Sequence, residues 1–77
     1  MDRFASIETF ITVADCGSFS AAAERLRLSK AMVSRHVQQL EQRLGIRLFA
    51  RTTRHLQLTD AGSEYLAGCR RLLEEFA

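Results

Sequence analysis

Apolar residues recur at three- and four-residue spacing near the start of this chain, which predicts an amphipathic helix over residues 1–16. Gly17 follows and is a natural helix-ending residue. The stripe that we expect to face the core consists of Phe4, Ile7, Phe10, Ile11 and Ala14. The pattern therefore begins with a helix that needs a partner surface.

Two shorter helical stretches follow, each with a serine placed to cap it. Ser18 precedes residues 19–26, where three consecutive alanines favour helix and let another backbone approach closely. Ser29 precedes residues 30–44, and Gly45 ends that stretch. Two short helices joined by the tight connection at residues 27–28 predict a helix-turn-helix.

The second of these helices has polar chemistry on the side opposite its apolar stripe. Its inward residues are expected to be Val33, Val37, Leu40 and Leu44. The outward residues near its start are then Lys30, Ala31, Ser34, Arg35 and Gln38. Lysine and arginine donate to guanine, glutamine pairs with adenine, serine bonds to either, and a methyl group meets the thymine methyl. This face is typical of a helix that reads base edges in the major groove.

The remainder predicts a small hairpin and a last helix. Short alternating stretches at 47–50 and 55–58 flank the polar residues 51–54, which indicates a β-hairpin, or wing, over about 47–58. The turn lacks Asn-Gly or Asp-Gly, so its geometry stays open. Thr59 caps a helix over 59–77. Its apolar face favours pairing with a second copy over packing within one domain, and comprises Tyr65, Leu66, Cys69, Leu72, Leu73 and Phe76.

Length and composition limit the class of protein. Seventy-seven residues make one small domain, and a hydrophobic fraction of 47% argues against a disordered tail. No apolar run is long enough to span a bilayer, and no signal peptide precedes the first helix, so a cytoplasmic protein without membrane contact is expected. The last helix has no stop signal, which suggests a fragment of a longer protein.

Charge is strongly polarised along the chain. Residues 25–54 contain eight basic residues and one acid, Glu41, for a formal charge of +7, while the rest carries three basic residues and eight acids, or −5. A basic segment of this density attracts polyanions, although a charge run alone is more often a solvated face. The base-reading pattern on the 30–44 helix favours the nucleic-acid interpretation.

No residues suggest catalysis or metal binding. His36 and His55 have no ligand or triad partners at suitable spacing, and Cys16 and Cys69 form no CxxC motif. His36 is expected at the edge of its helix, near DNA or the core. Both cysteines are expected to pack as small apolar side chains. We therefore expect no enzyme, no metal and no cofactor in this chain.

A set of motifs in order resembles the DNA-binding domain of LysR-type transcriptional regulators. They are residues 17–26 (GSFSAAAERL), 28–29 (LS), 33–35 (VSR), 40–41 (LE), 44–45 (LG), 48–51 (LFAR) and 58–62 (LTDAG). The resemblance covers nearly the whole chain. It implies a mainly α fold, with three helices and a β-hairpin wing forming a winged helix-turn-helix over 1–58, followed by a linker and dimerisation helix over 59–77.

The resemblance also implies roles and partners. Base contacts fall on Lys30, Ala31, Ser34 and Arg35, and the minor-groove contact of the wing falls on Arg54. Contacts to the DNA backbone fall on Ser18, Ser20, Ser29, Arg51 and Thr52. The expected partners are an interrupted inverted-repeat operator in double-stranded DNA and a second copy of the chain, with a tetramer open to the full-length protein. A small-molecule effector would bind a C-terminal domain absent from this chain.

One departure from the family changes the expected specificity. Many relatives have Gln-Pro where this chain has Lys30-Ala31. An ammonium group favours guanine or phosphate over adenine, so the operator of a Gln-Pro relative should not be transferred to this protein. The alternative function is a winged-helix module that binds protein, with an enzyme a distant third.

Overall fold

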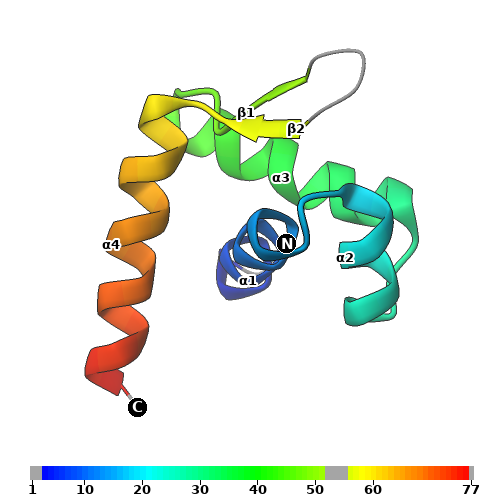
Figure 1. Ribbon diagram of the computed structural model, residues 1–77, viewed down its shortest axis with the longest axis horizontal. Helices are drawn as coiled ribbons and strands as arrows, with labels where there is room; N and C mark the ends of the chain where they lie inside the picture. The colour runs from blue at the N-terminus through cyan, green and yellow to red at the C-terminus, as the bar shows by residue number, and fades with distance from the viewer. Residues whose placement is uncertain (1–2, 52–55, 77) are drawn as a thin grey trace. The chain divides into compact units, whose positions relative to one another are not determined.

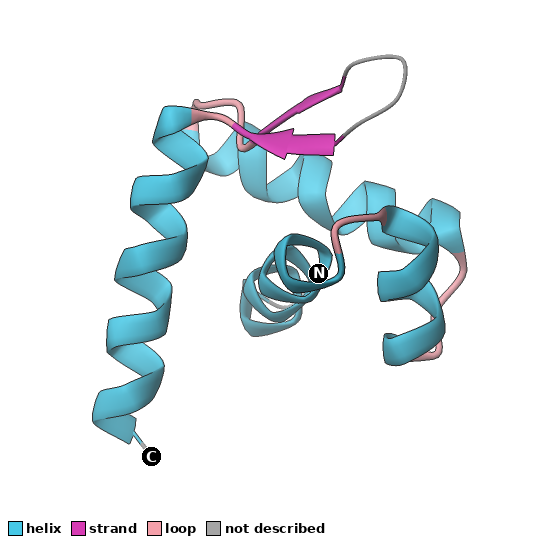
Figure 2. Ribbon diagram, in the orientation of Figure 1, coloured by secondary structure: helices cyan, strands magenta, loops and turns pink. Residues whose placement is uncertain are grey.

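The computed structural model describes residues 3–51 and 56–76, in four helices and one hairpin. Figure 1 shows their course from the N-terminus to the C-terminus, and Figure 2 shows that helix dominates. The elements are α1 (Arg3–Cys16), α2 (Phe19–Leu26), α3 (Lys30–Leu44), β1 (Phe49–Arg51), β2 (Leu56–Leu58) and α4 (Asp60–Phe76). The expected mainly α, winged helix-turn-helix architecture is confirmed.

The chain divides into two compact units, Met1–Gly45 and Ile46–Ala77. In the first unit α1 contacts both α2 and α3, and α2 contacts α3. The second unit contains the hairpin and α4, and β2 contacts α4. The predicted boundary after residue 58 stays a prediction.

The bounds of α2 and α3 follow from their capping residues. The Ser18 hydroxyl accepts a hydrogen bond from the Ala21 amide at 3.0 Å, and the Ser29 hydroxyl accepts one from the Met32 amide at 3.1 Å. Each bond satisfies a backbone donor that has no partner within its helix. Gly45 ends α3 in the left-handed conformation, with φ 70°, and its amide donates to the Glu41 carbonyl. Both helices begin and end where the sequence predicted.

The buried side of α1 differs from the expected apolar stripe. Phe10 is fully buried as predicted, but Phe4 is 66% exposed, and Ile7, Ile11 and Ala14 are only half-buried. The buried residues of α1 are Ser6, Thr9, Phe10, Thr12 and Val13.

Hydrogen bonds within the helix explain why threonine occupies that side. The Thr9 hydroxyl donates to the Ala5 carbonyl at 2.7 Å, and the Thr12 hydroxyl donates to the Glu8 carbonyl at 2.8 Å. A buried hydroxyl is costly only when it lacks a partner, and here each one bonds one turn back. Apolar spacing alone therefore misplaced the buried face of this helix.

The core of the first unit combines small and branched side chains. Ala22 is fully buried and Ala23 is 7% exposed, so the alanine run lies in the core, while the close backbone approach that it would permit stays a prediction. The predicted inward face of α3 is largely confirmed, since Val33, Val37 and Leu40 are buried and Leu44 is half-buried. Full burial of each valine or leucine contributes about 1.5–3 kcal/mol.

In the second unit, an antiparallel hairpin pairs Phe49 with Leu58, Ala50 with Gln57 and Arg51 with Leu56. The predicted wing is therefore present, although Arg51 belongs to β1 and not to the tip. Leu48, just before β1, is fully buried, while Leu56 and Leu58 are half-buried.

Thr59 connects the hairpin to α4. Its hydroxyl accepts from the Gly62 amide at 2.9 Å, which confirms the predicted cap, and donates to the Arg47 carbonyl. Its amide donates to the Leu48 carbonyl at 3.0 Å. Thr59 thus caps α4 and also holds the start of α4 next to Arg47 and Leu48, the residues that precede β1.

The same place explains the glycine of the LTDAG motif. A Cβ atom added at Gly62 would lie 2.2 Å from the Leu48 carbonyl oxygen, which belongs to the backbone. Gly62 has ordinary helical geometry, so the requirement is for space and not for a left-handed backbone. Only a residue without a side chain lets α4 start this close to Leu48.

Candidate nucleic-acid interface

The exposed side of α3 carries the residues that the sequence assigned to base contacts. Lys30, Ala31, Arg35 and Gln38 are exposed, and Ser34 is half-buried. At about 100° per residue these positions fall within an arc of about 140° around the helix, and the buried residues Val33 and Leu40 lie outside that arc. The structure therefore brings all five together at the start of one helix.

The chemistry of this side suits polyanion binding. Among the described residues, no carboxylate forms an ion pair with Arg25, Arg27, Lys30 or Arg35, and all four are exposed. Charges without local counter-ions leave a positive potential along α2 and the first turns of α3. Arg43, on the last turn of α3, and Arg47 are also exposed.

The serines assigned to the DNA backbone lie at the starts of α2 and α3. Ser18 is a half-buried cap, Ser29 is an exposed cap, and Ser20 is exposed in the first turn of α2. A capping hydroxyl uses its oxygen as an acceptor and keeps a proton that it can donate to a phosphate. The positive end of each helix dipole also favours an anion there.

The structure describes the wing only in part. Arg51 ends β1. Thr52 and Arg54, the predicted backbone and minor-groove contacts, lie outside the described residues, and so does His55.

The sequence did not predict the contact that His36 of α3 makes with Ser6 of α1. His36 is 6% exposed and therefore belongs to the core, one of the two placements that the sequence left open. Its Nδ1 atom lies 3.4 Å from the hydroxyl oxygen of Ser6 on α1, which is also buried. The only sequence signal was a histidine on the apolar side of α3, four residues before Leu40. This pair joins α3 to α1 through a polar contact.

The residues assigned to dimerisation lie along α4 with graded exposure. Tyr65 and Leu66 are half-buried, Cys69 is 5% exposed, Leu72 is 58% exposed and Leu73 is 43% exposed. The Phe76 side chain lies outside the described residues. The apolar face is therefore open mainly in its last turns, at Leu72 and Leu73.

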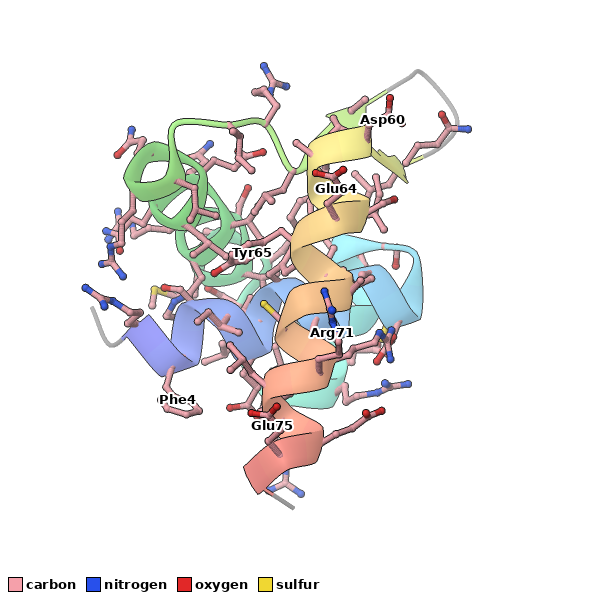
Figure 3. The ribbon with its side chains drawn as sticks, turned by 90° about the vertical axis from the view of Figure 1, so that its left-hand side faces the viewer. Phe4, Asp60, Glu64, Tyr65, Arg71 and Glu75 are labelled. Carbon is pink, nitrogen blue, oxygen red and sulfur yellow. The ribbon has the colours of Figure 1, made fainter. Side chains whose placement is uncertain are left out.

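A charged face runs along the opposite side of α4. Figure 3 shows Asp60, Glu64, Arg71 and Glu75 following one another down the helix, and all four are exposed. Their spacing keeps them within about 60° of one another around the axis, on the side away from Cys69 and Leu73. The charged and the apolar residues of α4 therefore lie on separate faces of the helix.

Cys69 is the buried residue of the apolar face of α4. Burial raises the pKa of the Cys69 thiol, and a hydrogen bond with Tyr65 lowers it to a smaller extent. A thiol with a raised pKa stays protonated and reacts poorly. The prediction that Cys69 packs as a small apolar side chain is confirmed, while Cys16 is half-buried.

Neither a metal site nor a membrane span is found in the part of the chain that the structure describes. Residues 3–51 and 56–76 hold no cluster of three or more histidine, cysteine or acidic side chains suited to a metal ion. Among the same residues, no helix is long and apolar enough to cross a bilayer.

Known proteins resemble this chain over nearly its full length. A transcriptional repressor of Pseudomonas aeruginosa is 49% identical over 97% of the chain, and the transcriptional activator AaeR of Escherichia coli is 43% identical over 97%. The chain spans about a quarter of the length of these relatives, 24% of each. In the crystal structure of the CbnR DNA-binding domain with DNA, the matching chain is 42% identical, with a TM-score of 0.86 over 96% of this chain and 84% of that one.

The sequence pattern of one protein family matches most of the chain. It is described as "Bacterial regulatory helix-turn-helix protein, lysR family", and it covers residues 4–63, from α1 into the first turn of α4. This span contains both capped helices, the hairpin and Gly62. The chain therefore belongs to the lysR family of bacterial regulatory helix-turn-helix proteins.

Proposed function

We propose that this chain is the sequence-specific DNA-binding domain of a bacterial LysR-type transcription regulator, and that α3 reads base edges in the major groove. The observation that carries the proposal is the exposed start of α3, where two basic residues, an amide and a methyl group share one side. An α-helix fits the major groove, and its first turns meet the base edges. Lys30, Ser34, Arg35 and Gln38 supply the hydrogen-bonding groups, and Ala31 supplies the methyl contact.

The remaining roles concern the DNA backbone and the minor groove. Ser18, Ser20, Ser29, Arg51 and Thr52 bind phosphates and set the orientation of the domain without reading sequence. Arg54 enters the adjacent minor groove, where a narrow A·T-rich stretch attracts arginine. The DNA-binding domain of CbnR, to which this chain is 42% identical, has been crystallised in complex with DNA.

Two copies joined through α4 bind an interrupted inverted repeat, because a two-fold dimer requires half-sites related by the same symmetry. The chain acts by binding and not by catalysis, on chromosomal DNA in the cytoplasm. It needs no cofactor of its own. An effector would act through a separate domain of the full-length protein, and a tetramer is an option for that full-length protein only.

The salt dependence of binding to a mixed-sequence duplex tests this function. Each phosphate neutralised adds about −0.9 to the slope of log K against log salt, so four or five contacts predict a slope of roughly −4. Fluorescence anisotropy between 50 and 200 mM salt, about the range in which such contacts lose most of their affinity, measures it. A selection from random duplexes should then enrich one inverted repeat. A flat slope, or no enrichment, would favour a module that binds protein.

A further inference from the structure

The connection between α2 and α3 has an unusual residue at its sharpest point. Arg27 follows α2 with φ 58° and ψ 42°, in the left-handed region. It is the only residue other than glycine with a positive φ in the described part of the chain. Gly17 and Gly45 occupy the two other positive-φ positions, with φ 75° and 70°. Glycine adopts this conformation without strain, whereas arginine does not.

The local structure does not require an arginine there. The Arg27 amide donates to the carbonyls of Ala23 and Glu24, and any residue except proline could make these bonds. The side chain is exposed, and within residues 3–51 and 56–76 its guanidinium has neither an ion pair nor a hydrogen bond. A strained position occupied by a side chain that neither packs nor pairs suggests a role outside the fold.

The position of Arg27 suits contact with a DNA phosphate. It lies three residues before Lys30, so its Cα is at most about 11 Å from the first residue of α3. The major groove is about 12 Å wide and has phosphates along both edges. A helix with its first turn in the groove therefore brings the preceding connection to the groove edge. From there a long guanidinium side chain can reach a phosphate and bind it with two hydrogen bonds.

We propose that Arg27 is a phosphate-binding residue of the DNA interface, held beside the start of α3 at a cost in backbone strain. Its contact adds affinity for any duplex and does not discriminate between sequences. This inference rests on the proposed function, because it places Arg27 next to the base-reading turn of α3.

Three variants of Arg27 separate its charge from its backbone strain. Arg27→Gly removes both, so its thermal midpoint should rise by about 4 °C. Its affinity for a mixed-sequence duplex should fall about fivefold at 0.1 M salt, and the salt slope should become shallower by about 0.9 per copy. Arg27→Asn tolerates the left-handed backbone without the charge, so it should show the same loss of affinity. Arg27→Lys keeps charge and strain, and its midpoint and slope should match the wild type.

Arg71→Gln is the matched control for loss of a positive charge. Arg71 lies on the charged face of α4 (Figure 3), so this variant should keep the wild-type salt slope. An unchanged slope in Arg27→Gly would overturn the proposal. So would a loss confined to duplexes that differ at one base pair, because that pattern marks a base contact. If the wild type binds no duplex at all, the proposed function itself fails, and this result is distinct from a wild type that binds while Arg27→Gly keeps its slope.

Discussion

Arg35 is the side chain on α3 best suited to identify a single base. It is exposed one helical turn after Ala31, and a guanidinium matches the two acceptors of guanine. Arg35→Ala should therefore cost about 1–3 kcal/mol on the selected operator and remove the preference at one base position. Affinities for the operator and its single-base variants measure this. The control is Arg43→Ala, on the last turn of α3, which should leave the base preference intact. A uniform loss over all sequences from Arg35→Ala would show a phosphate contact instead.

The two cysteines should react at very different rates. Burial raises the pKa of the Cys69 thiol, whereas Cys16 is half-buried on the last turn of α1. Because the thiolate is the reactive form, iodoacetamide at about pH 8 should alkylate Cys69 at least about tenfold more slowly than Cys16. Peptide mapping by mass spectrometry gives both rates, and they should converge in urea. Equal rates in the folded protein would contradict the burial of Cys69.

The same pKa shift predicts a pH dependence of stability. The folded pKa of Cys69 is raised above its unfolded value, near 8.5. The stability contributed by this thiol is therefore fully present below about pH 8.5 and is lost as the pH rises through the folded pKa.

The start of α4 and its middle each contain a glycine, and replacing them should have opposite effects. At Gly62 an added methyl group meets the Leu48 carbonyl oxygen at 2.2 Å, so Gly62→Ala should cost about 1–3 kcal/mol as the backbone shifts. At Gly68 nothing lies within 4 Å, so Gly68→Ala should stabilise the helix by about 0.5–1 kcal/mol. Urea unfolding at constant m-value measures both. A Gly62→Ala variant as stable as the wild type would contradict this packing.

The polar contact between α1 and α3 should stabilise the first unit. Ser6 and His36 are both buried, and their side chains lie within hydrogen-bonding distance at 3.4 Å. Ser6→Ala and His36→Leu should each destabilise the fold by about 1–3 kcal/mol, because each removes a buried partner. Combined, they should cost about 0.5–1.5 kcal/mol less than the sum of the single changes. Simple additivity in this double-mutant cycle would show that the two residues do not interact.

The sequence predicted some elements better than others, for physical reasons. The bounds of α2 and α3 follow from local signals, since Ser18, Ser29 and Gly45 each act on a helix end within a few residues. The buried face of α1 depends on packing against other helices. A threonine counts as polar in a sequence pattern, yet Thr9 and Thr12 are buried because their hydroxyls donate to backbone carbonyls of α1 itself. The left-handed conformation of Arg27 could not be predicted either, because glycine is the residue that usually adopts this conformation after a helix.

In the candidate site, too, the features with a local sequence signal were predicted, and those that depend on packing were not. The exposed residues of α3 were predicted because helical periodicity and base chemistry both selected them. The contact of His36 with Ser6 joins residues 30 positions apart, so no local pattern contains it. Gly62 belonged to a family motif, but its reason, the approach to the Leu48 carbonyl, required the structure.

The charge distribution along the whole chain complements its proposed partner. The basic residues concentrate in residues 25–54, with a net charge of +7, while α4 presents an acidic face at Asp60, Glu64 and Glu75. Positive charge near α3 should steer DNA towards that helix, and negative charge on α4 should oppose contact of its acidic face with phosphates. The two faces therefore differ in their expected affinity for DNA.

The open end of the apolar face of α4 should control assembly of the two-fold dimer. Leu72 and Leu73 are 58% and 43% exposed in the single chain, so changing both to glutamate should leave the monomer folded. Two acids placed within a paired apolar surface would be desolvated without partners, so association should weaken strongly. Sedimentation equilibrium measures that change. Affinity for the full inverted repeat should fall with it, while affinity for an isolated half-site should not, because each copy keeps its own α3. Arg71→Glu, on the charged face, is the matched control and should still associate. A doubly substituted chain that still dimerises would place the interface elsewhere on the molecule.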